Sequence, residues 1–198
     1  MINILLAGVG GQGTVLAAKV LAQAAQDKGW NVRTAETIGM AQRGGNVVSH
    51  VRMGDAGESV LSPLLGRKGA DLIIAFEPGE AARVVPYLAP GGTLVSATSA
   101  LQPVTAALSK KPYVAADLVA GIERALAQTS QTFVPIDDAA LCAQVGSRKV
   151  LNTILLASAL SQTDVALTLD DLRDAIRACV KPRFVGMILE AIDLVDEL

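Results

Sequence analysis

A glycine-rich turn near the amino terminus is the first feature whose residue types could do chemistry. Residues 8–13 have the spacing Gly-x-Gly-x-x-Gly, after an aliphatic run at 2–7 and before a proline-free Ala/Leu/Val segment at 14–28. Glycines there let helix-terminal N–H groups approach a pyrophosphate, and Glu36, beyond the next expected strand, would bind a ribose hydroxyl. The other interpretation is that the glycines only allow helix and strand to pack closely, or contact a neighbouring chain. A P-loop is excluded, because Thr14 occupies the place of its lysine.

A second polar segment lies between the second and third expected strands. Its central residues, 40–45, read Met-Ala-Gln-Arg-Gly-Gly, and ordinary dehydrogenases have no such segment at this place. Arg43 carries a planar fork of donors that matches phosphate or carboxylate groups. A solvated loop charge, or a salt bridge to a partner chain, is an equally open role for Arg43.

Residues 8–13, the segment 37–52 and the run Ala75-Phe76-Glu77-Pro78 together closely resemble the gamma-type module of the 2-oxoacid:ferredoxin oxidoreductases. The resemblance covers nearly the whole chain, and within that family it is strongest to the beta subunits of the indolepyruvate type. It implies a subunit of a thiamine-diphosphate enzyme that decarboxylates a 2-oxoacid, here an aryl pyruvate, reduces ferredoxin through iron–sulfur clusters and releases an acyl-CoA. Pyruvate, 2-oxoisovalerate and 2-oxoglutarate enzymes are the alternatives within the family. From another class, a stand-alone dinucleotide-binding oxidoreductase that uses Glu36 is also open.

The related domain of single-chain pyruvate enzymes is associated with coenzyme A. The resemblance therefore implies that the two loops meet the phosphates of coenzyme A, or that they contact the large subunit. The candidate residues for either role are Gly8, Gly10, Gly11, Gln12, Gly13, Arg43, Gly44 and Gly45. No catalytic residue and no metal ligand is expected on this chain.

The redox cofactors of the family need residues that the sequence does not supply. Cys142 and Cys179 are the only cysteines, whereas one iron–sulfur cluster takes about four thiolates. Gly54-Asp55-Ala56 begins like the family's thiamine-diphosphate fingerprint but lacks its last glycine. We therefore expect no firmly bound cofactor here. Thiamine diphosphate, Mg and the iron–sulfur clusters are expected on a large alpha-type partner subunit, through which ferredoxin is reached.

Five further features have a structural explanation in the sequence. His50, the only histidine, lies on the third expected strand and is predicted to be a surface or interface residue. Glu77 precedes a proline and is expected to be an acid at a helix start. Asn152, in an apolar helix, is expected to bond to backbone or to the second polar segment. Residues 181–183, Lys-Pro-Arg, separate two helices, either near a phosphate or as a plain junction, and the two cysteines are expected to be inert core thiols.

Composition narrows the class of protein. Of 198 residues, 51% are hydrophobic and 18% are charged, and 17 Lys and Arg against 19 Asp and Glu give a net charge of −2. Disorder is excluded, and the lack of a basic excess disfavours nucleic acid and anionic membranes as partners. The few cysteines and the lack of a signal peptide predict a cytoplasmic location, and Pro86, Pro90 and Pro103 break the longest uncharged run, so no transmembrane segment is expected. Because about 25% charged residues is typical, the low charge predicts burial of surface in an assembly, with homodimers of the isolated chain as one outcome.

The order of elements predicts an α/β fold, a three-layer Rossmann-like sandwich with a mainly parallel sheet and a hairpin, in a single domain over residues 1–198. Expected strands are 2–7, 30–35, 46–53, 71–76, 93–97 and 132–136, and expected helices are 14–28, 77–88, 116–128, 147–160, 170–180 and 183–198. The first strand, the first helix and the second strand are expected to form a βαβ unit. The hairpin is expected to join 46–53 to a returning strand at 58–61.

Overall fold

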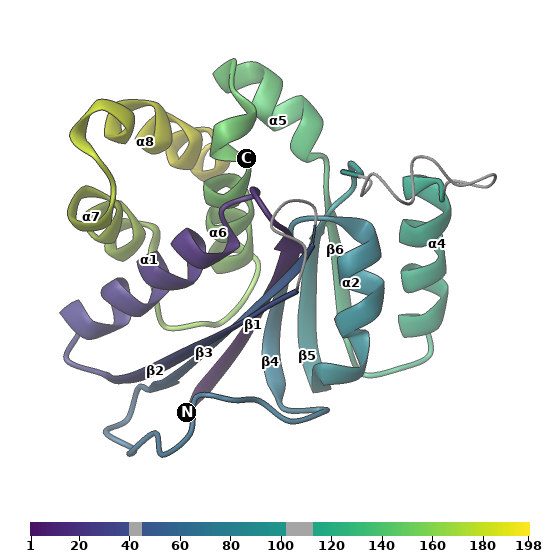
Figure 1. Ribbon diagram of the computed structural model, residues 1–198, viewed down its shortest axis with the longest axis horizontal. Coiled ribbons are helices and arrows are strands. Elements are labelled where there is room, and N and C mark those ends of the chain that lie inside the picture. Colours follow the sequence, from purple (N-terminus) through teal and green to yellow (C-terminus); the bar gives the residue numbers. More distant parts are fainter. Residues whose placement is uncertain (40–44, 102–112) are drawn as a thin grey trace.

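The computed structural model describes residues 1–39, 45–101 and 113–198 (Figure 1). Its strands are β1 (Ile2–Val9), β2 (Asn31–Ile38), β3 (Asn46–Gly54), β4 (Ala70–Ala75), β5 (Leu88–Ala97) and β6 (Thr132–Ile136). Its helices are α1 (Thr14–Asp27), α2 (Pro78–Val84), α4 (Ala115–Leu126), α5 (Asp138–Val145), α6 (Leu151–Ser161), α7 (Leu169–Cys179) and α8 (Pro182–Asp196), with short 3-10 turns η1 (Val85–Tyr87) and η2 (Arg148–Val150).

The six strands form one sheet in the order β2-β3-β1-β4-β5-β6. Strands β1, β4, β5 and β6 are parallel neighbours, while β3 is antiparallel to both β1 and β2. The predicted α/β fold with a mainly parallel sheet and a hairpin is confirmed. A single reversed strand is therefore the only departure from a fully parallel sheet among the described residues.

The position of the hairpin was predicted wrongly. Strand β3 turns back on β2, with Ile38 opposite Val47, and the N–H of Gly39 donates to the carbonyl oxygen of Asn46 at 2.8 Å. Residues 58–61 form no strand, because β3 already pairs on both sides and leaves them no edge to join. The same insertion of β3 separates β2 from β1, so the expected βαβ unit has a strand between its two parallel strands.

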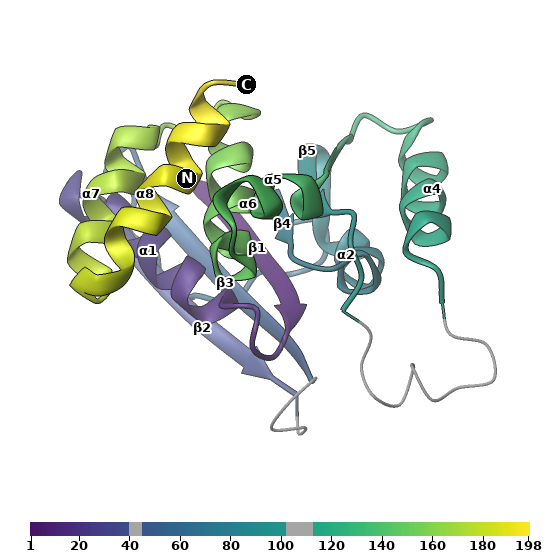
Figure 2. The same ribbon diagram turned by 90° about the horizontal axis from the view of Figure 1, so that it is seen from above.

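Helices cover both faces of the sheet, which gives three layers. In Figures 1 and 2, α2 and α4 lie on one side, and α1 with α5, α6, α7 and α8 lies on the other. Helix α1 packs closely on the sheet through small residues, of which Ala17, Ala18 and Ala25 are completely buried. Burial of these side chains, and not intrinsic propensity alone, holds such a helix in place.

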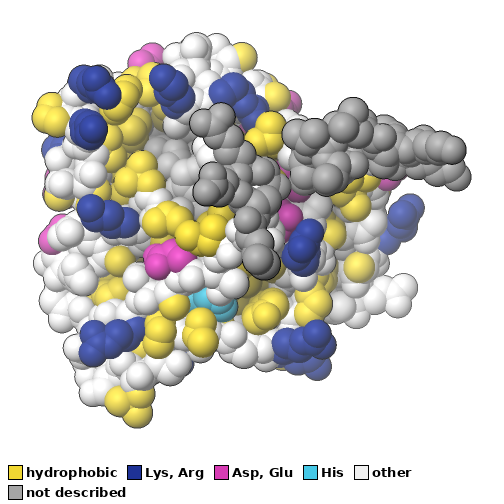
Figure 3. Space-filling model, viewed as in Figure 1, with side chains coloured by type: hydrophobic (Ala, Val, Ile, Leu, Met, Phe, Trp, Pro, Cys, Tyr) yellow, Lys and Arg dark blue, Asp and Glu magenta, His cyan; other side chains and the backbone are white. Residues whose placement is uncertain are grey.

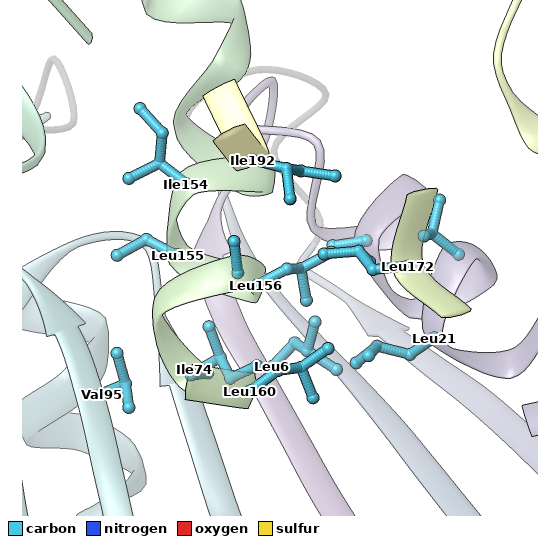
Figure 4. Packing of buried hydrophobic residues seen from close by; sticks show 14 of the residues in the cluster. Leu6, Leu21, Ile74, Val95, Ile154, Leu155, Leu156, Leu160, Leu172 and Ile192 are labelled. Atoms are coloured by element: carbon cyan, nitrogen blue, oxygen red, sulfur yellow. The ribbon is translucent and has the colours of Figure 1, made fainter. Parts of the chain in front are cut away.

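The larger core lies beneath α6. Leu6, Ile74 and Val95 project from the sheet toward Leu155 and Leu156 of this helix (Figure 4). Every residue from 151 to 160 is buried, since α6 lies between the sheet and the outer helices. A smaller core on the opposite face packs α2 and α4 against the sheet. Both cores are aliphatic, in keeping with the 3% aromatic content.

Helix α5 was not predicted, although the sequence contains its signals. The side chain of Asp137 accepts a hydrogen bond from the N–H of Ala140 at 3.0 Å and begins the helix. Gly146 ends it with φ 76°, a left-handed conformation that glycine adopts without strain. The helix expected over 147–160 therefore starts with the turn η2 and continues as α6.

Candidate functional site

The glycine loop, residues 8–13, lies where the sheet changes its winding direction. β1 and β4 are parallel neighbours, yet the chain leaves β1 into α1 on one face and leaves β4 into α2 on the other (Figure 1). In open α/β sheets ligands bind at this kind of switch point, beyond the carboxyl ends of the strands. The glycine loop is therefore placed where a ligand would be expected.

Gln12 holds the loop in shape with both ends of its side-chain amide. Its Oε1 accepts from the N–H of Val9 at 2.7 Å, and its Nε2 donates to the carbonyl oxygen of Phe76 at 2.8 Å. The first bond closes the turn, and the second connects it to the end of β4. Gln12 is thus used within the fold through both polar atoms.

The glycines of the loop have different reasons to be glycine. A Cβ on Gly8 would lie 2.8 Å from Thr14 Oγ1, so close packing explains this position. Gly11 has φ 104° and would place a Cβ in open space, whereas Gly13 has φ 83° and would place one 2.7 Å from Asn152 Nδ2. Close packing therefore accounts for Gly8, a positive φ facing open space accounts for Gly11, and both reasons apply to Gly13.

Helix α1 begins at this loop without the usual capping. Gly13 is its N-cap residue, no side chain caps it, and its first turn contains no acid. The amino end of a helix carries unpaired N–H groups and a partial positive charge. These groups are available to an anion.

The two loops predicted to act together are joined by a hydrogen bond. The N–H of Gly10 donates to the carbonyl oxygen of Gly45 at 2.8 Å. Arg43 and Gly44 lie outside the described residues. Their predicted role in binding coenzyme A or a partner subunit stays a prediction.

A hollow of about 440 Å³ opens beside the glycine loop, and we call it the glycine-loop hollow. Its polar lining comes from two places far apart in the sequence, the loop itself and the segment from η2 into α6. The lining residues used below are Gly11, Gln12, Gly13, Arg148, Lys149 and Asn152. Arg148 and Lys149 were missed in the sequence, where the only signal was two cations directly before an apolar helix.

A larger depression of about 700 Å³ lies at the opposite edge of the sheet, near Met1, Asp71 and Thr93. Met1 directly precedes β1 and Asp71 is the second residue of β4, so both lie at the amino ends of their strands. Parallel sheets place their ligand-binding loops at the carboxyl ends, so the smaller hollow is the better candidate site.

Asn152 and Glu77 have the structural roles expected of them. Asn152 Nδ2 lies 3.5 Å from the carbonyl oxygen of Gly13, so it contacts the backbone of the glycine loop. Glu77 is 1% exposed and caps α2, with Oε2 accepting from the N–H of Glu80 at 3.0 Å. Its Oε1 accepts from the hydroxyl of Tyr113 at 2.6 Å. Burial and this bond raise the pKa of Tyr113 above its ordinary value.

His50 and Glu36 differ from expectation. His50 is only 6% exposed, its Nδ1 accepts from the N–H of Leu65 at 3.2 Å, and burial lowers its pKa. Figure 3 shows this histidine among hydrophobic side chains. Glu36 lies within β2, opposite Ser49 of β3. Because β3 intervenes, β2 is two strand spacings from β1, about 9–10 Å, and Glu36 does not have the neighbouring-strand position of a ribose-binding acid.

The described residues do not group the side chains that a metal ion needs as ligands. Across 1–39, 45–101 and 113–198, no cluster of three His, Cys, Asp or Glu side chains could hold a metal ion. Cys142 is buried and Cys179 half-buried, and burial raises the pKa of both thiols. In the same ranges, no helix combines the length and the apolar character needed to cross a bilayer.

Residues 3–197 match the family model described as pyruvate ferredoxin/flavodoxin oxidoreductase. The chain belongs to this family. The resemblance inferred from the two loops is thereby confirmed, and the chain is a member of an oxidoreductase family.

Known relatives agree with this assignment. The chain is 34% identical over 195 residues to a protein of Archaeoglobus fulgidus named indolepyruvate oxidoreductase subunit IorB, covering 98% of this chain and 92% of that protein. The fold of this chain is similar to the crystal structure of a keto/oxoacid ferredoxin oxidoreductase gamma subunit from Geobacter sulfurreducens. The TM-score is 0.71 at 21% identity, and the match covers 100% of this chain and 97% of that one.

A second solved structure places the fold inside a longer polypeptide. It is a 2-oxoglutarate:ferredoxin oxidoreductase from Magnetococcus marinus with 2-oxoglutarate, coenzyme A and succinyl-CoA bound. The similarity has a TM-score of 0.69 and 17% identity, and it covers 100% of this chain but 31% of that one. The fold therefore occurs there as one part of a larger chain.

Proposed function

We propose that this chain is the small subunit of an indolepyruvate-type 2-oxoacid:ferredoxin oxidoreductase. In this proposal the complex decarboxylates an aryl pyruvate oxidatively, forms an acyl-CoA and transfers electrons to ferredoxin. The observation that carries it is the 34% identity, over nearly the full length of both chains, to a protein named indolepyruvate oxidoreductase subunit IorB. The two loop motifs, residues 8–13 and 37–52, resemble the same family, and this agreement supports the assignment.

The redox chemistry is assigned to a partner subunit. Thiamine diphosphate, Mg and the iron–sulfur clusters are assigned to a large alpha-type subunit, and ferredoxin reacts there. The low charged content of 18% supports a chain that buries part of its surface against such a subunit. The occurrence of this fold within 31% of a longer oxidoreductase chain also supports a part that works with other domains.

Coenzyme A is the proposed ligand of the two loops. The uncapped amino end of α1 and the nearby cations Arg148 and Lys149 support an anionic ligand. Arg43 is assigned to the same ligand by the family resemblance. Calorimetric titration of coenzyme A into the complex, with wild-type chain and with Arg43→Ala, tests this assignment, and unchanged affinity with unchanged assembly would exclude both roles of Arg43.

Reconstitution with the large subunit tests the function itself. The purified complex should reduce ferredoxin when given indolepyruvate and coenzyme A, and omission of this chain should abolish turnover. Pyruvate, 2-oxoisovalerate and 2-oxoglutarate are the comparison substrates, and a clear preference for one of them would replace the indolepyruvate assignment. Turnover by the isolated chain, or copurification of a flavin or nicotinamide with it, would overturn the proposal.

A further inference from the structure

A completely buried carboxylate lies behind the glycine-loop hollow. Asp138, at the start of α5, is 0% exposed. Its Oδ1 accepts from the backbone N–H groups of Thr98 and Ser99, at 3.1 and 2.9 Å. Its Oδ2 accepts from the hydroxyl of Ser99 and from Nη1 of Arg148, the latter at 2.8 Å. Asp138 thereby joins the end of β5 to the turn η2.

This carboxylate holds Arg148 in one orientation. Nη2 of Arg148 also donates to Ser99 Oγ at 3.0 Å, so two edges of the guanidinium are fixed from behind. The side chain is nevertheless 53% exposed and lines the glycine-loop hollow. A guanidinium has five N–H donors. Among residues 1–39, 45–101 and 113–198 only Asp138 and Ser99 accept from this one, which leaves its other donors for a ligand.

The positive charge around the hollow exceeds what Asp138 compensates. Lys149 lines the same hollow, and in the described part of the chain its ammonium contacts the ring of Phe184, 5.9 Å from the centroid, with no carboxylate in salt-bridge range. The uncapped amino end of α1 adds a partial positive charge from the loop side. On the face seen in Figure 3, Lys and Arg side chains gather along the margin where α7 and α8 lie.

We propose that Arg148, held in place by Asp138 and Ser99, is the cationic contact for a phosphate-bearing ligand in the glycine-loop hollow. Lys149 supplies a second charge, and the backbone N–H groups of the loop complete the site. Asp138 and Ser99 are positioning residues, since they act through Arg148. A hollow of about 440 Å³ is large enough for the diphosphate of a nucleotide or of coenzyme A. The assignment to coenzyme A rests on the proposed function, whereas the assignment of the phosphate contact does not.

The test uses the complex with its large subunit and a variant that removes both charges together. Removing Arg148 alone would leave Asp138 buried without a counter-charge and risks unfolding. In Asp138→Asn/Arg148→Gln, Asn Oδ1 keeps the bonds from Thr98 and Ser99, and its amide can donate to Ser99 Oγ. The matched control is Asp174→Asn/Arg177→Gln, which removes the exposed ion pair of α7, joined at 2.6 Å. Circular dichroism and thermal melting establish that both variants fold.

The probes are coenzyme A, ADP and pantetheine, which lacks phosphate, titrated calorimetrically. We expect the Asp138/Arg148 variant to bind coenzyme A and ADP at least tenfold more weakly, to bind pantetheine as the wild type does, and to raise the KM for coenzyme A more than it lowers kcat. Arg148→Lys should recover only part of the affinity, because it restores charge without the fork. Equal affinity of wild type and variant for both phosphate ligands would overturn the proposal. Arginine-dependent binding of ADP by a complex that does not bind coenzyme A would support the site and contradict the proposed function.

Discussion

The side-chain amide of Gln12 donates a hydrogen bond to the carbonyl oxygen of Phe76 at 2.8 Å, across the point where β1 and β4 end. The same amide accepts from the N–H of Val9 at 2.7 Å. The Gln12 side chain thus links the glycine loop to the segment that leads from β4 into α2. Two hydrogen bonds hold the loop at the place where the ligand is proposed to bind.

Replacing Gln12 by leucine should lower the free energy of unfolding by about 1–3 kcal/mol, because the Val9 N–H and the Phe76 carbonyl lose their partner in a half-buried place. Urea denaturation measures the change. Gln12→Glu keeps the acceptor for the Val9 N–H but places a second acceptor oxygen against the Phe76 carbonyl, so it should destabilise the chain as well. Leucine at the exposed Gln128 is the control and should change stability by less than about 0.5 kcal/mol. An equal effect at both positions would contradict the bridging role.

Two glycine substitutions separate backbone strain from steric contact. Both Gly11 and Gly13 have positive φ, so alanine at either should cost about 1 kcal/mol or more. Only at Gly13 would the new Cβ lie 2.7 Å from Asn152 Nδ2. Gly13→Ala should therefore be the more destabilising, and Gly13→Ala combined with Asn152→Ala should remove much of the difference. Thermal melts of the three variants measure this, and equal costs for Gly11→Ala and Gly13→Ala would refute the steric contact.

His50 should make stability depend on pH in mildly acidic solution. Its Nδ1 accepts from Leu65, and burial lowers its pKa, so the folded chain takes up this proton less readily than the unfolded chain, whose histidine has a pKa near 6.5. Stability is therefore full above about pH 6.5 and falls as the pH is lowered below that value. The free energy of unfolding is measured for wild type and for His50→Gln at pH 7.5, 6.5 and 5.5. As the pH is lowered, the wild-type value should fall relative to that of the variant. A difference that stays constant with pH would exclude this role.

Glu80 should have the opposite pH dependence. Its side chain is buried, none of the residues that the structure describes hydrogen-bonds to Oε2, and burial raises the pKa of its carboxyl group. The folded chain therefore holds this proton at a pH where the unfolded chain, with a glutamate pKa near 4.3, has released it. The wild-type chain therefore loses stability as the pH rises above about 4. Glu80→Gln does not, so it should gain on the order of 1 kcal/mol of stability relative to wild type.

Melting temperatures at pH 4, 5.5 and 7 measure the Glu80 effect. Glu190→Gln, at an exposed position, is the matched control and should change little across this range. The nearby Arg83 lies 3.4 Å from Glu80 Oε1 and is 61% exposed, so loss of that ion pair should matter little. A Glu80→Gln variant that loses stability relative to wild type as the pH rises would contradict the prediction.

The isolated chain should associate with itself or aggregate, and the large subunit should suppress this. The physical reason is the low share of charged residues, 18%, together with large exposed apolar side chains such as Leu61, 92% exposed, and Ile38, 64% exposed. Light scattering with and without the large subunit measures the mass of each species. A well-behaved monomer under both conditions would refute the prediction.

Local residue types were enough to predict most of the elements. The run at 2–7 followed by closely spaced glycines indicated a buried strand and a tight turn, and both are present. The helix-start role of Glu77 likewise follows from its place before a proline. These features depend on neighbours a few residues away, so a pattern in the sequence can report them. Helix α5 belongs to the same class, and its signals at Asp137 and Gly146 were overlooked.

Long-range pairing decided the rest. The local sequence does not predict that β3 inserts between β1 and β2, because the stability of a strand depends on the strands that pair with its two edges. That insertion moves Glu36 away from the glycine loop and buries His50. The candidate site has the same origin: Arg148 and Lys149 reach Gly13 across more than a hundred residues of chain, only because α6 packs beside α1. Contacts between distant segments carry no local periodicity, and the folded chain alone reveals them.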